Sequence, residues 1–136
     1  MDLKVTSFRL EDSANRKVGR GELRRIAELE ELLARLDGDS LVSVFLQSRD
    51  WAYLCIAGGL SGSFCCQFVD NERGVLRSLV AESTKSSASH EVAIALQKPG
   101  DTMDVPGRNV VPLAVALDVA KHFVTTGELH GGYVWE

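Results

Sequence analysis

Long apolar runs, proline and cysteine are scarce in this chain of 136 residues, which has 3 Pro and 3 Cys. No apolar run approaches the roughly 20 residues needed to span a bilayer, so we expect no membrane span. The first residues, MDLKVTSFRLEDS, lack a basic leader followed by an apolar block, and the sequence therefore predicts no secretory signal. The cysteines, Cys55, Cys65 and Cys66, are an odd number without zinc-like spacing, which indicates reduced thiols and a cytoplasmic protein.

Positive charge is also in short supply, and the formal net charge is −4. Residues 1–36 carry 8 Lys and Arg against 7 Asp and Glu, whereas residues 37–136 carry 7 against 12. Neutralising phosphates needs a basic face, so this balance argues against direct nucleic-acid binding and is compatible with a basic protein partner. The length, 45% hydrophobic residues and 25% charged residues are typical of one globular domain, which we expect to cover residues 1–136.

The most apolar helix is expected near the C-terminus, over residues 112–126. Pro112 would stand in its first turn, where a missing backbone N–H is tolerated, and Gly127 follows at the position of a left-handed cap. Apolar side chains cover more than half of its circumference, which is typical of a helix packed on a sheet. These side chains are Leu113, Val115, Ala116, Leu117, Val119, Ala120, Phe123 and Val124. We expect this helix to be the central element of the core.

A second helix is expected from Glu22 to Leu36, before the turn residues Asp37 to Asp39. Its apolar residues recur at helical spacing on one face: Leu23, Ile26, Leu29, Leu33 and Leu36. Upstream of it, residues 3–10 predict a peripheral strand, and the polar, glycine-punctuated residues 11–21 predict a linker.

The middle of the chain has the period of β-strands. Strands are expected at residues 41–47, 51–57, 63–69, 75–81, 91–96 and 131–135. The continuous apolar run 91–96 is typical of a central strand covered on both faces, whereas residues 82–89 predict a mobile loop and 97–109 a long connection. Gly58 to Gly62 predict a hairpin loop. The predicted fold class is therefore α+β: an antiparallel sheet of mostly sequential hairpins, one helix before it, one packed helix near the C-terminus and a short closing strand.

Adjacent Cys65 and Cys66 are the most conspicuous candidates for chemistry. On a strand their side chains point to opposite faces, so they cannot share one metal ion, and buried cysteine commonly acts as a small hydrophobe. Asp118 and His122 stand four residues apart on the polar face of the long helix, which favours a surface pair over an oriented catalytic base. The spacing assembles no set of nucleophile, base and oxyanion donors, so the sequence predicts no catalytic site, metal site or cofactor.

Two alternatives stay open at this point. One is a small-ligand-binding or regulatory module with a pocket between helix and sheet. Its lining residues would be Phe64, Cys66 and Phe68. The other is an enzyme that uses Cys65 or Cys66 together with His90 or His130, and its reactive thiol would have a lowered pKa.

The C-terminal stretch resembles a known family. Its succession is Val111-Pro112, an alanine- and valine-rich helix to Phe123, Gly127, and then Tyr133-Val134-Trp135. This is similar to the end of the first-numbered family of immunity proteins of bacterial polymorphic toxins, a group that includes immunity proteins for deaminase toxins acting on DNA. The upstream order of helix, short strands and Pro/Gly connection is also similar, whereas residues 3–21 have no counterpart in the resemblance.

The resemblance implies a cytoplasmic protein that binds and neutralises one cognate toxin domain by covering its active site or substrate groove, without catalysis or a cofactor. A toxin acting on nucleic acid presents basic residues to phosphate, so we expect acidic side chains to contact it. The residues expected to do so are acidic, loop-borne and outside the core pattern: Asp70, Glu72, Glu82, Asp101 and Asp104. Self-association through an edge strand stays open.

Overall fold

The computed structural model describes residues 3–12, 14, 16–49, 51–81, 93–95 and 104–136. Within these residues the chain forms ten strands, two α-helices and two 3-10 turns. In chain order they are β1 (Ser7–Glu11), β2 (Lys17–Glu22), α1 (Ala27–Ala34), β3 (Ser43–Arg49), β4 (Ala52–Gly58), η1 (Leu60–Gly62), β5 (Ser63–Asp70), β6 (Val75–Val80), β7 (Ala93–Ala95), β8 (Asp104–Pro106), η2 (Gly107–Asn109), β9 (Val111–Pro112), α3 (Leu113–Thr126) and β10 (Val134–Trp135). Neither described helix has the length and hydropathy of a membrane-spanning segment.

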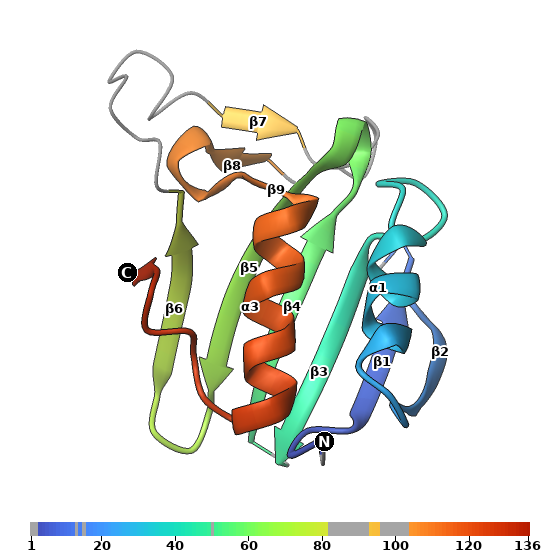
Figure 1. Ribbon diagram of the computed structural model, residues 1–136. Helices are drawn as coiled ribbons and strands as arrows, with labels where there is room; N and C mark the ends of the chain where they lie inside the picture. The colour runs from blue at the N-terminus through green and yellow to red at the C-terminus, as the bar shows by residue number, and fades with distance from the viewer. Residues whose placement is uncertain (1–2, 13, 15, 50, 82–92, 96–103) are drawn as a thin grey trace.

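The strands form one large antiparallel sheet and one small one. Among the described residues the large sheet has eight strands, in the order β10-β6-β5-β4-β3-β1-β2, with β9 paired to β5. In the same residues, β7 and β8 pair with each other as a separate sheet. Both helices lie on the same face of the large sheet (Figure 1). The predicted α+β class, the sequential hairpins, the packed C-terminal helix and the closing strand β10 are confirmed.

Helix α3 packs across the centre of the large sheet and forms the core with it. Its inward side chains are fully buried: Ala116, Val119, Ala120, Phe123 and Val124. The ring of Phe123 meets that of Phe68 edge to face, with centroids 6.1 Å apart. Gly127 caps the helix in a left-handed conformation, and its N–H donates to the oxygen of Phe123 at 2.7 Å. The prediction of a central C-terminal helix is confirmed, except that Leu113 is exposed and Pro112 stands just before the first turn.

The predicted linker at residues 11–21 is wrong, because its second half belongs to β2, an edge strand of the large sheet. The β1–β2 hairpin closes on Asp12, whose carboxylate accepts two backbone N–H groups of the turn. Gly21 of β2 lies opposite Phe8 of β1, and a Cβ at Gly21 would come within 2.9 Å of the Phe8 ring. This glycine therefore makes room for an aromatic side chain and does not mark a flexible link.

Helix α1 is shorter than the sequence predicts. It begins at Ala27 and not at Glu22, because Glu22 is the last residue of β2. The carboxylate of Glu28 accepts the backbone N–H groups of Arg24 and Arg25, at 2.7 and 2.8 Å, and satisfies donors ahead of the helix. Two strands thus precede the first helix. The predicted apolar face is largely confirmed by the buried leucines: Leu23, Leu29, Leu33 and Leu36.

The prediction of a central strand at residues 91–96 is wrong. The described part of this run, β7, pairs with β8 in the separate sheet. Both sides of β5 are already occupied, by β4 on one side and by β6 and β9 on the other. An apolar run indicates a strand but does not identify its partner. The connection predicted at 97–109 correspondingly contains β8 and η2, and the mobile loop predicted at 82–89 lies outside the described residues.

The hairpin between β4 and β5 rests against the end of α1. Gly59, in the predicted hairpin loop, has φ 106°, and a Cβ placed on it would collide with the backbone oxygen of Leu36. Gly62, in the same loop, has φ 72°, and a Cβ there would meet nothing within 4 Å. Position 59 therefore requires glycine because two backbone segments approach closely there. Position 62 requires glycine only because its backbone is in the left-handed conformation.

Replacing Gly59 by alanine should destabilise the protein much more than replacing Gly62. Both substitutions put a β-carbon into a left-handed conformation, which costs roughly 1–2 kcal/mol. At Gly59 the new methyl group also collides with backbone, so we expect a loss of more than about 3 kcal/mol of unfolding free energy. Chemical denaturation of Gly59→Ala and Gly62→Ala measures the difference. Equal losses would contradict the packing of this hairpin on the end of α1.

Candidate functional site

Two of the predicted partner-binding residues, Asp70 and Glu72, lie together at the turn between β5 and β6. Asp70 is the last residue of β5 and is 2% exposed. One carboxylate oxygen accepts the backbone N–H groups of Glu72 and Arg73, at 3.1 and 3.2 Å, and the other lies 3.9 Å from Nε of Arg73. The expectation that Asp70 is a loop residue outside the core is therefore wrong, because its side chain closes the turn from inside. Its role in partner binding stays a prediction.

Of the other predicted acidic residues, the structure describes Glu72 and the backbone of Asp104. Glu72 is exposed at the tip of the turn between β5 and β6. Asp104 begins strand β8, near the opposite end of the large sheet (Figure 1), and its side chain is not among those described. Glu82 and Asp101 lie outside the described residues. The acidic site residues that the structure describes therefore do not form one cluster.

The three cysteine thiols are free, and Cys65 and Cys66, which are adjacent in sequence, lie on different faces of the sheet. Cys66 belongs to the main core, whereas Cys65 packs with Ala57 on the opposite face, as the strand alternation predicts. Burial raises the pKa of Cys65 to about 11, and it also raises the pKa values of Cys55 and Cys66. Thiols of this kind suit packing better than nucleophilic catalysis. In the described part of the chain, no group of three His, Cys, Asp or Glu side chains is placed to hold a metal ion.

The side chains considered for a ligand pocket fill the space between helix and sheet. Phe64 and Cys66 are buried in the same core cluster as α3. Phe68 is partly buried, and its ring closes on that of Phe123. These three side chains are therefore core contacts of α3.

Native thiols should react slowly with iodoacetamide. The thiolate is the reactive form, and its fraction at pH 8 falls about 100-fold when the thiol pKa rises from 9.0 to about 11, as at Cys65. We therefore expect alkylation in the folded protein to be slower than in urea by roughly 100-fold or more, as counted by mass spectrometry. Rapid labelling of folded Cys65 would instead support the thiol-enzyme alternative.

The C-terminal segment brings together polar side chains that sequence spacing does not connect. The Tyr133 hydroxyl donates to the carboxylate of Asp118 at 2.9 Å, and His130 Nε2 lies 3.4 Å from the same oxygen. The rings of His122 and His130 lie side by side, with centroids 4.7 Å apart. Trp135 Nε1 donates to the backbone oxygen of His130 at 3.2 Å. These contacts hold the segment before β10 against α3.

We call the face of the large sheet that carries no helix the open face. At its β8 end Cys55, Ala57 and Cys65 pack with Val105 and Val110, and the rest of it is a broad surface. Along each strand, the side chains that alternate with those of the open face are buried under the helices, among them Leu10, Leu46 and Leu54. Cross-strand register places two rows of side chains on the open face. One row is Arg20, Arg9, Phe45, Cys55, Gln67 and Ser78. The other is Glu22, Ser7, Gln47, Tyr53, Val69 and Leu76. With strands about 4.8 Å apart, each row spans roughly 24 Å.

Aromatic and exposed apolar side chains stand on this open face. The Arg9 guanidinium lies 4.2 Å from the centroid of the Phe45 ring, and that ring meets Tyr53 edge to face at 5.4 Å. Leu76 is 62% exposed and lies beside Val69 of the neighbouring strand. Arginine and aromatic residues are enriched where proteins bind one another. The open face therefore has the composition of a protein contact surface.

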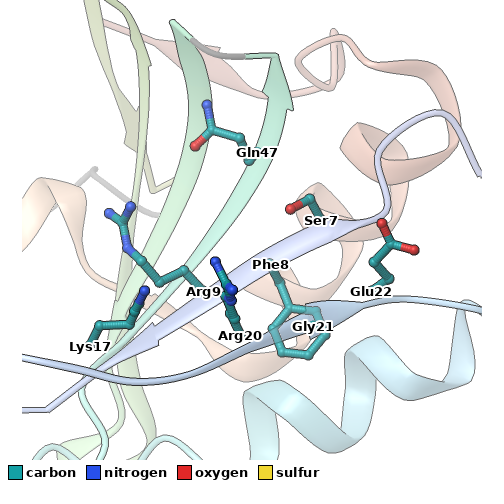
Figure 2. Close-up of a pocket in the computed structure, with 8 residues that line it drawn as sticks. All are labelled: Ser7, Phe8, Arg9, Lys17, Arg20, Gly21, Glu22 and Gln47. Carbon is teal, nitrogen blue, oxygen red and sulfur yellow. The ribbon is translucent and has the colours of Figure 1, made fainter.

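A pocket of about 500 Å³ lies at the β1–β2 end of the open face. Its lining residues are Ser7, Phe8, Arg9, Lys17, Arg20, Gly21, Glu22 and Gln47. Figure 2 shows the nitrogen ends of Arg9, Lys17 and Arg20 gathered toward one side of it and Glu22 at the other. We call this site the cationic pocket. The sequence does not predict this pocket, because the segment that forms β2 is assigned to a linker. The glycines at alternate positions in that segment have the period of two residues that is typical of a strand.

Comparison with known proteins identifies the family. Residues 20–136 match the family model described as immunity protein Imm1. The chain belongs to this family. The match includes both described helices and every described strand from β3 onward, and it confirms the resemblance of the C-terminal stretch. Comparisons with curated proteins and with solved structures gave no match.

Membership in the Imm1 family suggests toxin neutralisation by binding a cognate toxin protein, without a catalytic role. The matched range begins at Arg20, so β1 and the first half of β2 precede it. This agrees with the sequence analysis, in which residues 3–21 do not resemble any part of the family. Arg9 and Lys17 lie before the matched range, whereas Arg20 and Glu22 lie within it, so the cationic pocket of this Imm1 chain is built by a hairpin that the matched range includes only in part.

Proposed function

We propose that this chain is the immunity protein of one bacterial toxin domain, which it binds and neutralises by covering the toxin's active site or substrate groove. The observation that carries the proposal is the family match over residues 20–136. Inhibition by coverage needs a preformed surface rather than catalytic groups. The open face supplies such a surface, because its strands are held from the other side by the buried side chains of α1 and α3.

We further propose that the toxin acts on nucleic acid, with a DNA deaminase as the specific candidate. The resemblance of the C-terminal stretch to the deaminase-immunity group supports this choice. Such a toxin presents basic residues to phosphates, and acidic side chains of an inhibitor can occupy the same positions. Glu72 suits this role because it is exposed at the tip of the turn that Asp70 closes. We assign Glu82, Asp101 and Asp104 to the same role, and Asp70 to holding Glu72 in place.

The complex acts, on this proposal, in the cytoplasm. A toxin that attacks nucleic acid has to be stopped where the nucleic acid is. Coverage of its active site requires no cofactor and no direct contact between the inhibitor and nucleic acid.

Co-expression tests the pairing. A toxin domain encoded in the adjacent reading frame should arrest growth when expressed alone and should be tolerated when this chain is expressed with it. Continued growth arrest with both proteins present in the cell would contradict the proposed function.

Charge reversal tests the acidic residues. Glu72→Lys, and the double variant Asp101→Lys with Asp104→Lys, should each slow association with the toxin roughly tenfold at low salt and flatten its salt dependence. Glu30→Lys is the matched control, because Glu30 is exposed on α1, away from the open face. Stopped-flow association rates measure the effect. Rates equal to that of the control variant would remove these residues from the interface.

A further inference from the structure

The cationic pocket concentrates positive charge in an acidic protein. Arg9, Lys17 and Arg20 line it together with one carboxylate, Glu22, while the whole chain has a formal net charge of −4. Arg9 lies directly opposite Arg20 in the β1–β2 register. Like charges in directly opposite positions destabilise a sheet. The arrangement becomes favourable when an anion lies between the two side chains.

Arg9 is held in position by its surroundings. Its guanidinium lies 4.2 Å from the centroid of the Phe45 ring, and its Nε lies 3.2 Å from a carboxylate oxygen of Glu11. That Nε is buried and makes no hydrogen bond within the described part of the chain, so its contact with Glu11 is an ion pair only. A guanidinium has five N–H donors in a rigid fork, more than this one ion pair engages. Arg9 is thus oriented in advance for a further acceptor.

We propose that the cationic pocket receives an acidic segment of the cognate toxin domain, with Asp or Glu carboxylates seated among Arg9, Lys17 and Arg20. This inference rests on the proposed function and assigns a partner chemistry to one end of the open face. Arginine binds carboxylates through paired, charge-assisted hydrogen bonds. A volume of about 500 Å³ has room for a short segment of chain.

An acidic protein segment fits this pocket better than nucleic acid does. Glu22 stands at the end of the pocket away from the three cations, which opposes a polyanion running through it (Figure 2). Residues 37–136 carry 7 Lys and Arg against 12 Asp and Glu, so the rest of the chain repels a long phosphate backbone. With the acidic residues assigned above, the inhibitor then presents both signs of charge, which fixes the orientation of its complex.

The location of the pocket gives it a role in partner choice. Arg9 and Lys17 precede the part of the chain that matches the family. A contact made by such residues distinguishes this chain from relatives that share only the matched range, and charge complementarity mainly sets specificity and encounter rate.

A titration with a synthetic hexaglutamate peptide tests the pocket without the toxin. In NMR spectra of the full chain, the peptide should shift the backbone amide signals of β1 and β2 and leave those of α3 in place. The double variant Lys17→Gln with Arg20→Gln should raise the Kd for the peptide about tenfold or more. Both side chains are exposed, so this variant should stay folded. The matched control is Arg25→Gln with Arg77→Gln, which removes the same charge from exposed arginines outside the pocket and should leave the Kd unchanged.

Three results of this titration would overturn the proposal. The first is an absence of shifts in β1 and β2. The second is equal weakening of peptide binding in the two double variants, which would mean that general charge and not the pocket is responsible. The third is tighter binding of a single-stranded DNA hexamer at the same amides, which would make the pocket a nucleic-acid site.

Binding of the toxin domain separates the failure of this inference from the failure of the proposed function. We expect the toxin to bind the wild-type and control chains equally, and the Lys17→Gln, Arg20→Gln chain about tenfold or more weakly. Equal affinity for all three chains overturns the pocket inference and leaves the proposed function standing. No binding to the wild-type chain overturns the proposed function and the toxin as occupant, while the peptide titration still reports whether the pocket takes acidic segments.

Discussion

Burial of one face of the large sheet is the constraint on which the rest of the structure depends. Helix α3 lies across β4 and β5 and contacts α1 beside it, with Phe123, Val119 and Ala120 fully buried. Burial of apolar surface is the main favourable term in folding, so this layer holds the strands in register. Because both helices lie on the same face, the open face is kept rigid from behind without a helix covering it (Figure 1). The candidate contact surface is a consequence of how the core is built.

Elements that have a pattern in their own sequence could be predicted from it. Elements whose structure depends on a pairing partner elsewhere in the chain could not. The C-terminal helix has its own periodicity and its own stop at Gly127, and the strands from β3 to β6 are joined by short turns. By contrast, Gly21 indicates a linker when the sequence is considered alone, and only the structure shows that it makes room for Phe8 on the opposite strand. The apolar run 91–96 indicates a strand but does not identify β8 as its partner. Asp70 shows the same limit within the candidate site, because only the fold shows that its carboxylate closes a turn. The cationic pocket needed β2, which the predicted linker concealed.

The thiols and the polar side chains of the C-terminal segment have structural roles. This leaves the open face as the main candidate for function among the described residues. The thiols are packing groups whose pKa values are raised by burial. The contacts of Asp118 with His130 and Tyr133 hold the C-terminal segment against α3. The open face combines a cation held over Phe45, an exposed Leu76 and a pocket built by a hairpin that the family match includes only in part. A sheet backed by two helices, with a hairpin at its edge that the family match includes only in part, suits an inhibitor that must recognise one toxin.

Equilibrium denaturation of two single variants tests the one-sided burial most directly. Phe123→Ala removes a fully buried ring beneath α3 and should lower the unfolding free energy by about 3–5 kcal/mol. Leu76→Ser changes an exposed side chain on the open face and should stay within about 0.5 kcal/mol of the wild type at every protein concentration. A comparable loss in both variants, or a concentration-dependent loss for Leu76→Ser, would contradict the account, because it would mean that the open face is itself buried, for example against a second copy of the chain.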